Sequence, residues 1–366
     1  MKKRGLSEVV TTLILVLLVL VAIAIVWVVI SNLIRDKGDD IGSSTFEVSM
    51  AVKTVEPSST LGNVLVRVER NVGGGDLQGI NIILSDGIKS YTHKERTNLL
   101  DEGEETTYDI SKGGLGAITK VSIRPIGGSD GNEKIGEVVG ERELSYDQSV
   151  KSLGGLIAWW KFENDAKDAT GNGHDGTEQG GVSYVTGQVE QAADFDGSNS
   201  ITNNILSETN TGDFSVVFWV KWNVMGSSRR IVSNRGGSGD VGWEVRSNLD
   251  GEVQTLLDFG IVGGVDRGAD LVTATGLTTN QWYHIVSTID RSGNIIIYVN
   301  GEEQGSPQVI SDHNGQTLST TSPFCMGDAL TCISPPGSHM GQIDELAIFN
   351  RALTADEIKS IYELTK

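Results

Sequence analysis

Three oxygen-bearing side chains lie close together in a glycine-rich turn. Asp168, Asn172 and Asp175 fall within one short segment, and the residues between them include two glycines. Carboxylate, amide and backbone oxygens on a flexible turn are the ligands that a hard cation such as calcium prefers. Asp344, near the end of the chain, could add a carboxylate once the chain has folded. These four residues predict a calcium site, and the alternative is a tight turn in which the aspartates only cap backbone amides.

Catalysis is a second possible use of the acidic residues. A retaining glycosidase needs two carboxyl groups about 5–5.5 Å apart on one face. Asp344 and Glu345 are neighbours, and neighbouring residues of a strand point to opposite faces, so we expect that they do not form such a pair. His174 has no cysteine or second histidine near it in the sequence, and the chain has neither a Gly-x-Ser-x-Gly elbow nor a zinc-binding histidine pair. We therefore predict no catalytic residue.

The element that positions everything else is an apolar stretch near the N-terminus. Residues 9–30 contain no glycine, proline or charge, and a helix of that length covers the ~30 Å hydrocarbon core of a bilayer. Basic residues precede the stretch, whereas the charges after it nearly cancel, so its N-terminal side is expected in the cytoplasm. We predict a single membrane helix, contact with the membrane through residues 9–34, and an extracellular location for residues 43–366.

The residues before this helix carry a possible processing site. Residues 2–9, KKRGLSEV, resemble the class III signal of type IV pilins and archaellins, particularly archaeal ones. The resemblance implies a leader (1–5) that is cut between Gly5 and Leu6, a retained helix (6–35), a linker (36–44) and assembly into a pilus-like filament. Glu8 would be the third mature residue, whereas bacterial pilins carry glutamate at the fifth. It either pairs with the N-terminal amine of a neighbouring subunit or lies among lipid headgroups.

Composition limits the partners of the outer part. The chain has 46 glycines and 6 prolines, and its net charge is −19. This negative charge argues against nucleic acid or anionic lipid as a partner, because phosphates would be repelled. Its two cysteines, Cys325 and Cys332, are too few for a disulfide framework or a four-cysteine zinc site. Because disulfides persist outside the cell, we predict a Cys325–Cys332 bond, and the alternative is two buried thiols.

Residues 45–145 show the pattern of a small β-sandwich. Residues 45–55 and 63–70 alternate apolar and polar side chains, and shorter runs of this kind follow at 79–84, 106–110, 118–123 and 135–139. The pattern is similar to the β domains that archaeal pilins and archaellins carry after their helix. A linker is expected at 146–155.

Five ordered signatures mark residues 156–366. They lie at 157–177 (beginning IAWWKF), 191–197 (QAADFDG), 214–222 (FSVVFWVKW), 281–301 (beginning QWYHIV) and 341–353 (GQIDELAIFNRAL). In this order they resemble the laminin-G-like branch of concanavalin A-like jelly rolls. The resemblance implies two curved antiparallel sheets, binding of glycans or glycoproteins and, in several members, calcium.

The residue pattern supports the same fold. Residues 214–222 are apolar on both faces, as in a central strand, and residues 285–289 and 295–299 flank a hairpin turn. The capping box at 354–357 predicts a short C-terminal helix that packs on the sandwich. The fold class is therefore mainly β, with an N-terminal membrane helix, a small β-sandwich and a jelly roll.

These features indicate a surface-displayed, pilin-like adhesive protein whose laminin-G-like domain binds glycans or glycoproteins. The first alternative is a permanently anchored structural or scaffolding protein, and the second is an extracellular glycan hydrolase. The sequence does not locate the ligand-binding surface. Trp243 and residues 260–270 are candidates, although Trp243 fits a core position better.

Overall fold

The structure, a computed structural model, describes residues 48–366 with short gaps at 74, 76, 129–132, 204–208, 236–240, 250, 263–264, 267–268 and 328–337. The predicted membrane helix, with Gly5, Leu6 and Glu8, lies outside the described residues, and so does Cys332. Within the described ranges, no helix is long and apolar enough to cross a membrane. Cys325 is disulfide-bonded, and its pairing with Cys332 stays a prediction.

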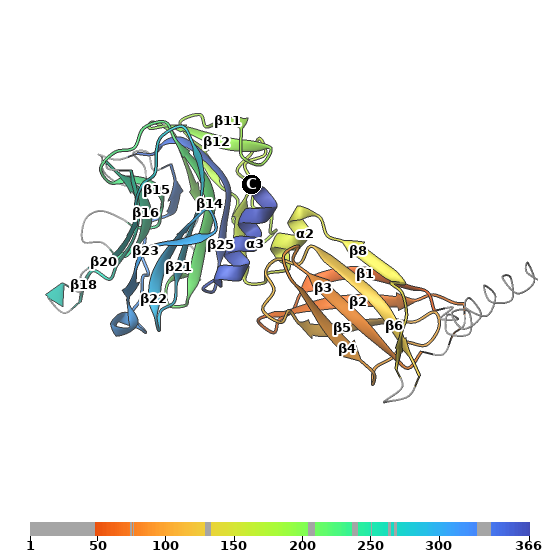
Figure 1. The fold of residues 1–366 in the computed structure, drawn as a ribbon. Helices are drawn as coiled ribbons and strands as arrows, with labels where there is room; N and C mark the ends of the chain where they lie inside the picture. The colour runs from red at the N-terminus through yellow and green to blue at the C-terminus, as the bar shows by residue number, and fades with distance from the viewer. Residues whose placement is uncertain are drawn as a thin grey trace, which may run out of the picture.

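The described chain is mainly β, as predicted, and its sheets are antiparallel (Figure 1). Its N-terminal part contains two small sheets. The strands of the first are β1 (Met50–Pro57), β2 (Asn63–Arg70) and β5 (Glu105–Ser111); those of the second are β3 (Gly79–Ser85), β4 (Ser90–Glu95), β6 (Lys120–Gly127), β7 (Lys134–Ile135) and β8 (Gly140–Glu143). Val66 of β2 and Ile82 of β3 belong to one buried cluster, so the two sheets share a core.

Two strands of this part lie in segments without the alternation of apolar and polar residues that predicts a strand. The segment of β4 has one aromatic side chain, Tyr91, among polar residues, and β8 has no apolar residue. Both pair at one side only, β4 with β3 and β8 with β6. The run predicted at 135–139 contributes only the short strand β7.

Helix α2 (Tyr146–Lys151) lies in the segment expected to be a linker. Its first turn is closed by a capping box: Gln148 N donates to Ser145 Oγ, and Ser145 N donates to Gln148 Oε1. Val150 and the following Leu153 are buried. The connection between the two β regions is therefore packed against them.

Two large sheets form the jelly-roll sandwich of the C-terminal part. The seven-stranded sheet has the order β10 (Thr177–Gln179), β13 (Ser200–Asn203), β24 (Phe324–Met326), β15 (Arg229–Ser233), β16 (Gly242–Asn248), β17 (Glu252–Asp258) and β20 (Ala269–Ala274). The eight-stranded sheet has the order β11 (Ser183–Thr186), β12 (Gln191–Asp196), β25 (Met340–Phe349), β14 (Phe214–Trp222), β21 (Trp282–Ile289), β22 (Asn294–Val299) and β23 (Glu302–Val309), with β9 (Leu156–Trp160) paired to β25. The remaining elements are the β18 (Ile261–Val262) and β19 (Val265–Asp266) pair and the 3-10 helix η2 (Ser311–His313).

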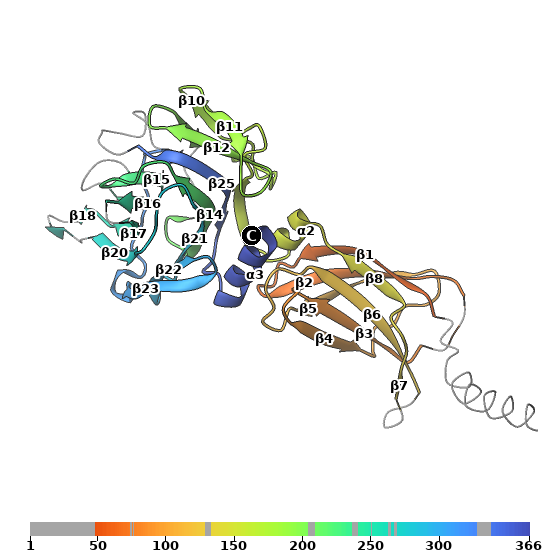
Figure 2. The ribbon, with the colours of Figure 1, turned by 45° about the horizontal axis from the view of Figure 1, so that its top comes forward.

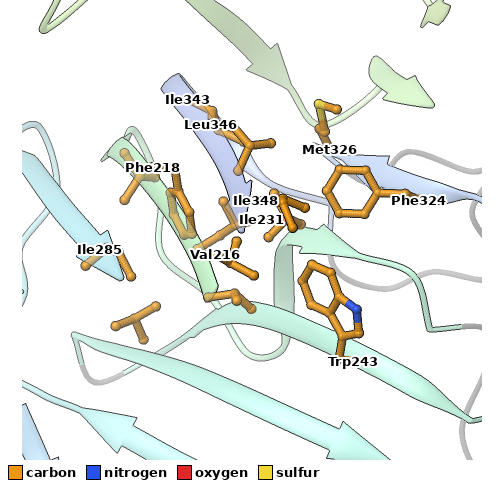
Figure 3. Packing of buried hydrophobic residues seen from close by; sticks show 14 of the residues in the cluster. Val216, Phe218, Ile231, Trp243, Ile285, Phe324, Met326, Ile343, Leu346 and Ile348 are labelled. Atoms are coloured by element: carbon orange, nitrogen blue, oxygen red, sulfur yellow. The ribbon is translucent and has the colours of Figure 1, made fainter. Parts of the chain in front are cut away.

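The core lies between these two sheets. Side chains of both meet there, among them Phe218 and Ile348 of the eight-stranded sheet and Trp243 and Phe324 of the seven-stranded sheet (Figure 3). Trp243 is fully buried, which confirms the core position. The predicted central strand is confirmed as well, because β14 pairs with β21 on one side and β25 on the other.

Helix α3 (Ala355–Thr365) is the predicted short C-terminal helix. Glu357 N donates to Thr354 Oγ1 at 3.3 Å, and Thr354 N donates to Glu357 Oε2 at 3.0 Å, which completes the predicted capping box. Ile358 and Ile361 pack on the outer face of the eight-stranded sheet. Figure 2 shows α3 and α2 between the jelly roll and the N-terminal sheets.

Candidate functional site

The first predicted metal ligand, Asp168, uses its carboxylate to close a turn. Asp168 Oδ1 accepts hydrogen bonds from the backbone N–H groups of Trp159 (3.1 Å) and Thr170 (3.0 Å), and Oδ2 accepts one from His174 N (3.2 Å). The hydroxyl of Thr170 lies 2.7 Å from both oxygens. Burial alone would raise the pKa of Asp168, but these hydrogen bonds hold it below its usual value.

The other predicted ligands divide into two places. Asp175 Oδ1 accepts from Asp168 N at 2.9 Å, and Asn172 Nδ2 donates to Ile157 O at 2.7 Å, so both belong to the same turn. Asp344 instead accepts from backbone groups of the segment after β11. Within the described ranges there is no group of three or more His, Cys, Asp or Glu side chains that could hold a metal. Calcium binding by the four predicted residues stays a prediction.

Asp344 and Glu345 lie at a β-bulge of β25. Trp219 of β14 is paired with Asp344, whereas Val217 is paired with Ala347, so the register shifts between them. Glu345 has a φ of 51°, a left-handed conformation that a non-glycine residue rarely adopts. At such a bulge the side chains of successive residues no longer alternate between the two faces of the sheet.

The expectation that these two carboxyls point to opposite faces is therefore wrong. Ile343 and Leu346 both contribute to the inner core, which leaves the two residues between them on the outer face. Asp344 Oδ2 accepts from Gln188 N at 2.9 Å and from Val189 N at 2.8 Å. Both acidic side chains are buried, so a sugar does not reach them. The reason to expect no glycosidase pair is therefore the burial of the two carboxyls, and no longer their orientation.

Glu345 is enclosed by two aromatic donors. Its Oε2 accepts from Tyr146 Oη at 2.9 Å and from Trp159 Nε1 at 2.7 Å. Its Oε1 has no hydrogen-bond partner among the described residues, and neither has Asp344 Oδ1. Burial raises the pKa of Asp344 to about 8 and that of Glu345 to about 7. Burial thus favours the protonated form of both carboxyls, whereas the positive charge of Lys161 acts in the opposite direction on Glu345.

A small cavity adjoins this acidic pair. It measures about 10 Å³, room for one water molecule, and it is lined by both Glu345 and His284. His284 is 1% exposed, and its ring lies 5.2 Å from that of Trp219 and 5.9 Å from that of Tyr362. Neither ring nitrogen has a partner among the described residues, and burial lowers the pKa of His284 to about 3. This site is closed by α3.

The outer face of the seven-stranded sheet carries a different kind of polar group. Glu244 of β16 lies between Trp243 and Val245, which both point into the core, so its side chain lies on the opposite face. Glu244 Oε2 lies 2.7 Å from Arg230 Nε, and Oε1 lies 2.8 Å from the terminal nitrogen Nη1 of Arg246. Only 1% of the Glu244 side chain is exposed.

The network extends onto β17. Arg235 Nη2 lies 2.6 Å from Asp258 Oδ2, and its Nη1 lies 3.6 Å from Glu244 Oε2. Gln254 Oε1 accepts from Arg246 Nε at 3.0 Å. We call this set the Glu244 cluster: Arg230, Arg235, Glu244, Arg246, Gln254 and Asp258.

Sequence reasoning missed the Glu244 cluster, although part of a signal was present. In β16 and β17 charged and amide side chains alternate with core residues such as Val245 and Leu257. That alternation indicates a polar outer face, but it does not reveal that residues from three strands form one hydrogen-bonded network.

Residues 195–359 match the family described as the concanavalin A-like lectin/glucanases superfamily, by its laminin-G type 3 model. The C-terminal part of the chain thus carries a concanavalin A-like, laminin-G-like domain, as the sequence signatures imply. No curated protein matches the chain.

Several solved structures are similar in fold. Domain 4 of AbnA, a GH43 extracellular arabinanase from Geobacillus stearothermophilus solved with arabinotriose, is 22% identical with a TM-score of 0.40, covering 58% of this chain and 98% of that one. The botulinum neurotoxin serotype D binding domain is 19% identical with a TM-score of 0.45, covering 57% and 50%. A botulinum neurotoxin type C structure is 15% identical with a TM-score of 0.47, covering 58% and 51%. The chain thus spans about half the length of the neurotoxin chains.

Proposed function

We propose that the protein is a surface-displayed, pilin-like adhesive protein whose laminin-G-like domain binds glycans or glycoproteins through the outer face of the seven-stranded sheet. The observation that carries this proposal is the Glu244 cluster. It gathers guanidinium, carboxylate and amide groups on the outer face of the seven-stranded sheet, whereas α2 and α3 pack on the other sheet. Glu244 itself is buried, and the side chains that a ligand can reach are those of Arg230 and Arg246, which are 14% and 18% exposed.

The cluster has the chemistry that a polyhydroxylated ligand requires. Guanidinium and carboxylate groups are planar and form paired hydrogen bonds, and sugar hydroxyls both donate and accept. Because Glu244 holds Arg230 and Arg246 in place, their side chains have fixed orientations before a ligand arrives, which lowers the entropic cost of binding.

Aromatic stacking contributes less to this face. Trp243 and Phe324, the large aromatic side chains of β16 and β24, are fully buried and point into the core. We therefore infer recognition by hydrogen bonds, with selectivity for the arrangement of hydroxyl groups.

Glycan-array binding by the full chain in detergent tests the site. Gln254→Ala removes the amide oxygen that accepts from Arg246 Nε, so Arg246 loses part of its fixed orientation. We expect this variant to lower the signal for any glycan that the unaltered protein binds by about tenfold, the cost of a hydrogen bond of ~1.4 kcal/mol. Gln304→Ala is the matched control, because Gln304 is exposed on β23 of the other sheet. Equal binding by both variants would place the glycan elsewhere.

The anchor is part of the same proposal. A filament subunit has its leader removed between Gly5 and Leu6, whereas a permanent membrane anchor keeps it. Mass spectrometry of the N-terminus of the native surface protein distinguishes the two. A mature chain that begins at Leu6 supports the filament, and an intact Met1 favours the structural or scaffolding alternative.

Several laminin-G-like domains hold calcium, which is what the resemblance implies for this chain. The predicted calcium ligands differ in whether their carboxylate oxygens already accept hydrogen bonds. Both carboxylate oxygens of Asp168 already accept hydrogen bonds, whereas Asp344 Oδ1 is buried without a partner among the described residues. We propose Asp344 as the carboxylate that would hold the ion. The next residue, Glu345, also has a buried oxygen, Oε1, without a partner among the described residues. A divalent cation there supplies positive charge to two buried carboxylates.

A further inference from the structure

We propose that the N-terminal sheets and the jelly-roll domain form one rigid arm, locked by helix α3, which holds the seven-stranded sheet away from the N-terminal sheets. Figures 1 and 2 show α3 between the two regions, with β15, β16 and β20 on the far side of the jelly roll. The contacts across α3 carry the proposal. We call them the α3 seam: residues 112–118 of the N-terminal part against residues 152–153 and 351–361.

A buried ion network forms the centre of the α3 seam. Lys112, which follows β5, is 2% exposed, and its Nζ lies 3.0 Å from Glu357 Oε1 in α3. Arg351 holds the same carboxylate with two bonds, Nη1 to Oε2 at 2.6 Å and Nη2 to Oε1 at 2.9 Å. Arg351 Nη2 also donates to Leu153 O at 2.8 Å. Separating the regions would break the contact between Lys112 and Glu357 and would leave Glu357 with Arg351 alone.

Two backbone N–H groups of the N-terminal part donate hydrogen bonds to serine side chains across the α3 seam. Ala117 N donates to Ser360 Oγ of α3 at 2.8 Å, and Ile118 N donates to Ser152 Oγ after α2 at 2.8 Å. Ala117, Ile118 and both serine side chains are buried. Opening the seam would therefore require these N–H groups to find new partners.

Close apolar packing completes the α3 seam. Ala117 belongs to the same buried cluster as Ile358 and Ile361 of α3 and as Val217 of the eight-stranded sheet. A Cβ added at Gly116 would clash with the Ser360 side chain and come within 2.9 Å of Asp356 O. The space at Gly116 is thus filled by α3 itself.

These contacts differ from those of a flexible linker. Domains of one chain usually move relative to each other unless their interface is large and apolar. Here the connecting segment is helix α2, whose Val150 is buried in the same cluster as α3, and the ionic, backbone and apolar contacts come from separate elements. One consequence is that the Glu244 cluster keeps a fixed direction relative to the N-terminal sheets.

Distance measurement between spin labels tests the rigid arm without any ligand, so its result is independent of the proposed function. Labels placed at Asp101 and Glu303, both exposed, report the separation of the two regions in the full chain in detergent. We expect one narrow distance distribution. A broad distribution in the otherwise unaltered protein would overturn the proposal.

Two variants test whether the α3 seam is what fixes the distance. Gly116→Leu forces Ser360 away, and we expect a second, longer population of distances. Lys112→Met removes the buried charge of the N-terminal side while leaving the Arg351–Glu357 pair, and it provides the same test if Gly116→Leu does not fold. Glu56→Leu, an exposed position of β1, is the control. A distribution that stays narrow in the folded seam variants would also overturn the proposal.

Discussion

The two sheets of the jelly roll share one core but have opposite outer faces. On the eight-stranded sheet the outer residues Val217, Ala347 and Phe349 are apolar and receive α2 and α3. On the seven-stranded sheet the outer residues of β16 and β17 include Glu244 and Gln254, which bond with arginines. A strand buries one face for folding, so the other face is free to differ. In this protein α2 and α3 pack on the outer face of the eight-stranded sheet, which we call the docking face. The outer face of the seven-stranded sheet carries polar groups instead.

The docking face nevertheless encloses polar groups of its own. Glu345 and His284 line the cavity next to α3, and Asp344 lies under the segment after β11. Each of the three has a buried atom without a hydrogen-bond partner among the described residues, whereas Glu244 has close partners on both oxygens. Buried polar groups destabilise a fold when unpaired and are tolerated when paired. The two faces should therefore respond differently to substitution, pH and cations.

The largest expected effect is at the centre of the seven-stranded sheet. Glu244→Ala leaves the arginines of the Glu244 cluster without their shared carboxylate, and we expect it to lower the free energy of unfolding by about 3–5 kcal/mol. Urea denaturation followed by tryptophan fluorescence measures this. A loss below about 1 kcal/mol would show that the cluster is solvated and that the two outer faces are less different than their contacts indicate.

A somewhat smaller effect is expected on the docking face. Ile361→Ala opens a cavity between α3 and the eight-stranded sheet, where Ile361 is 4% exposed, and should cost about 3 kcal/mol. Ile88→Ala is the control, because Ile88 is 52% exposed and should cost less than about 0.5 kcal/mol. Similar losses at both positions would argue against α3 as a tightly docked element.

The docking face should also make stability depend on pH in two directions. Because the folded-state pKa values of Asp344 (about 8) and Glu345 (about 7) are raised, the folded chain binds protons that the unfolded chain has released, so stability falls as pH rises from about 5 towards 8. Two buried histidines act oppositely: His284 on this face, and His339, whose ring lies 6.0 Å from that of Phe195 in the inner core. Burial lowers the pKa of each to about 3, which reduces stability below about pH 6.5.

Chemical denaturation in a chelator between pH 4.5 and about 9 should therefore show a broad maximum at about pH 5 to 6, where the two carboxyls and the two histidines act in opposite directions, and a fall in stability towards pH 8. Asp344→Asn should flatten the alkaline limb and move the maximum to higher pH, because the two histidines then outweigh the one remaining carboxyl below about pH 6. An alkaline limb that is unchanged in this variant would mean that the Asp344 carboxyl is ionised in the folded protein at neutral pH.

The smallest expected effect is that of calcium. At a hundred times the dissociation constant a cation stabilises the folded state by about 2.7 kcal/mol, and the open Asp344 Oδ1 predicts that Asp344→Asn abolishes this gain. Asp168→Ala should lower the melting temperature equally in chelator and in calcium, because it removes a turn cap. If Asp168→Ala instead lowered the melting temperature more in calcium than in chelator, the calcium site would lie in the turn that contains Asp168.

Local pattern was sufficient for much of the fold. The apolar faces of residues 214–222 predict the central strand β14, and Thr354 with Glu357 predicts the start of α3. Helix α2 was missed because six residues are too few to show a helical period. The edge strand β4 was missed because its residues are mostly polar, and its pairing with β3 is decided by backbone hydrogen bonds.

The sequence by itself determined which residues are apolar, which can cap a helix and which carry charge. It therefore specified the jelly-roll signatures, the core position of Trp243 and the C-terminal helix. Only the tertiary structure decided where charges meet. The Glu244 cluster needs three strands in register, and the bulge that turns Glu345 outward needs β14 as its neighbour. Both depend on contacts between residues far apart in the chain, which local periodicity does not encode.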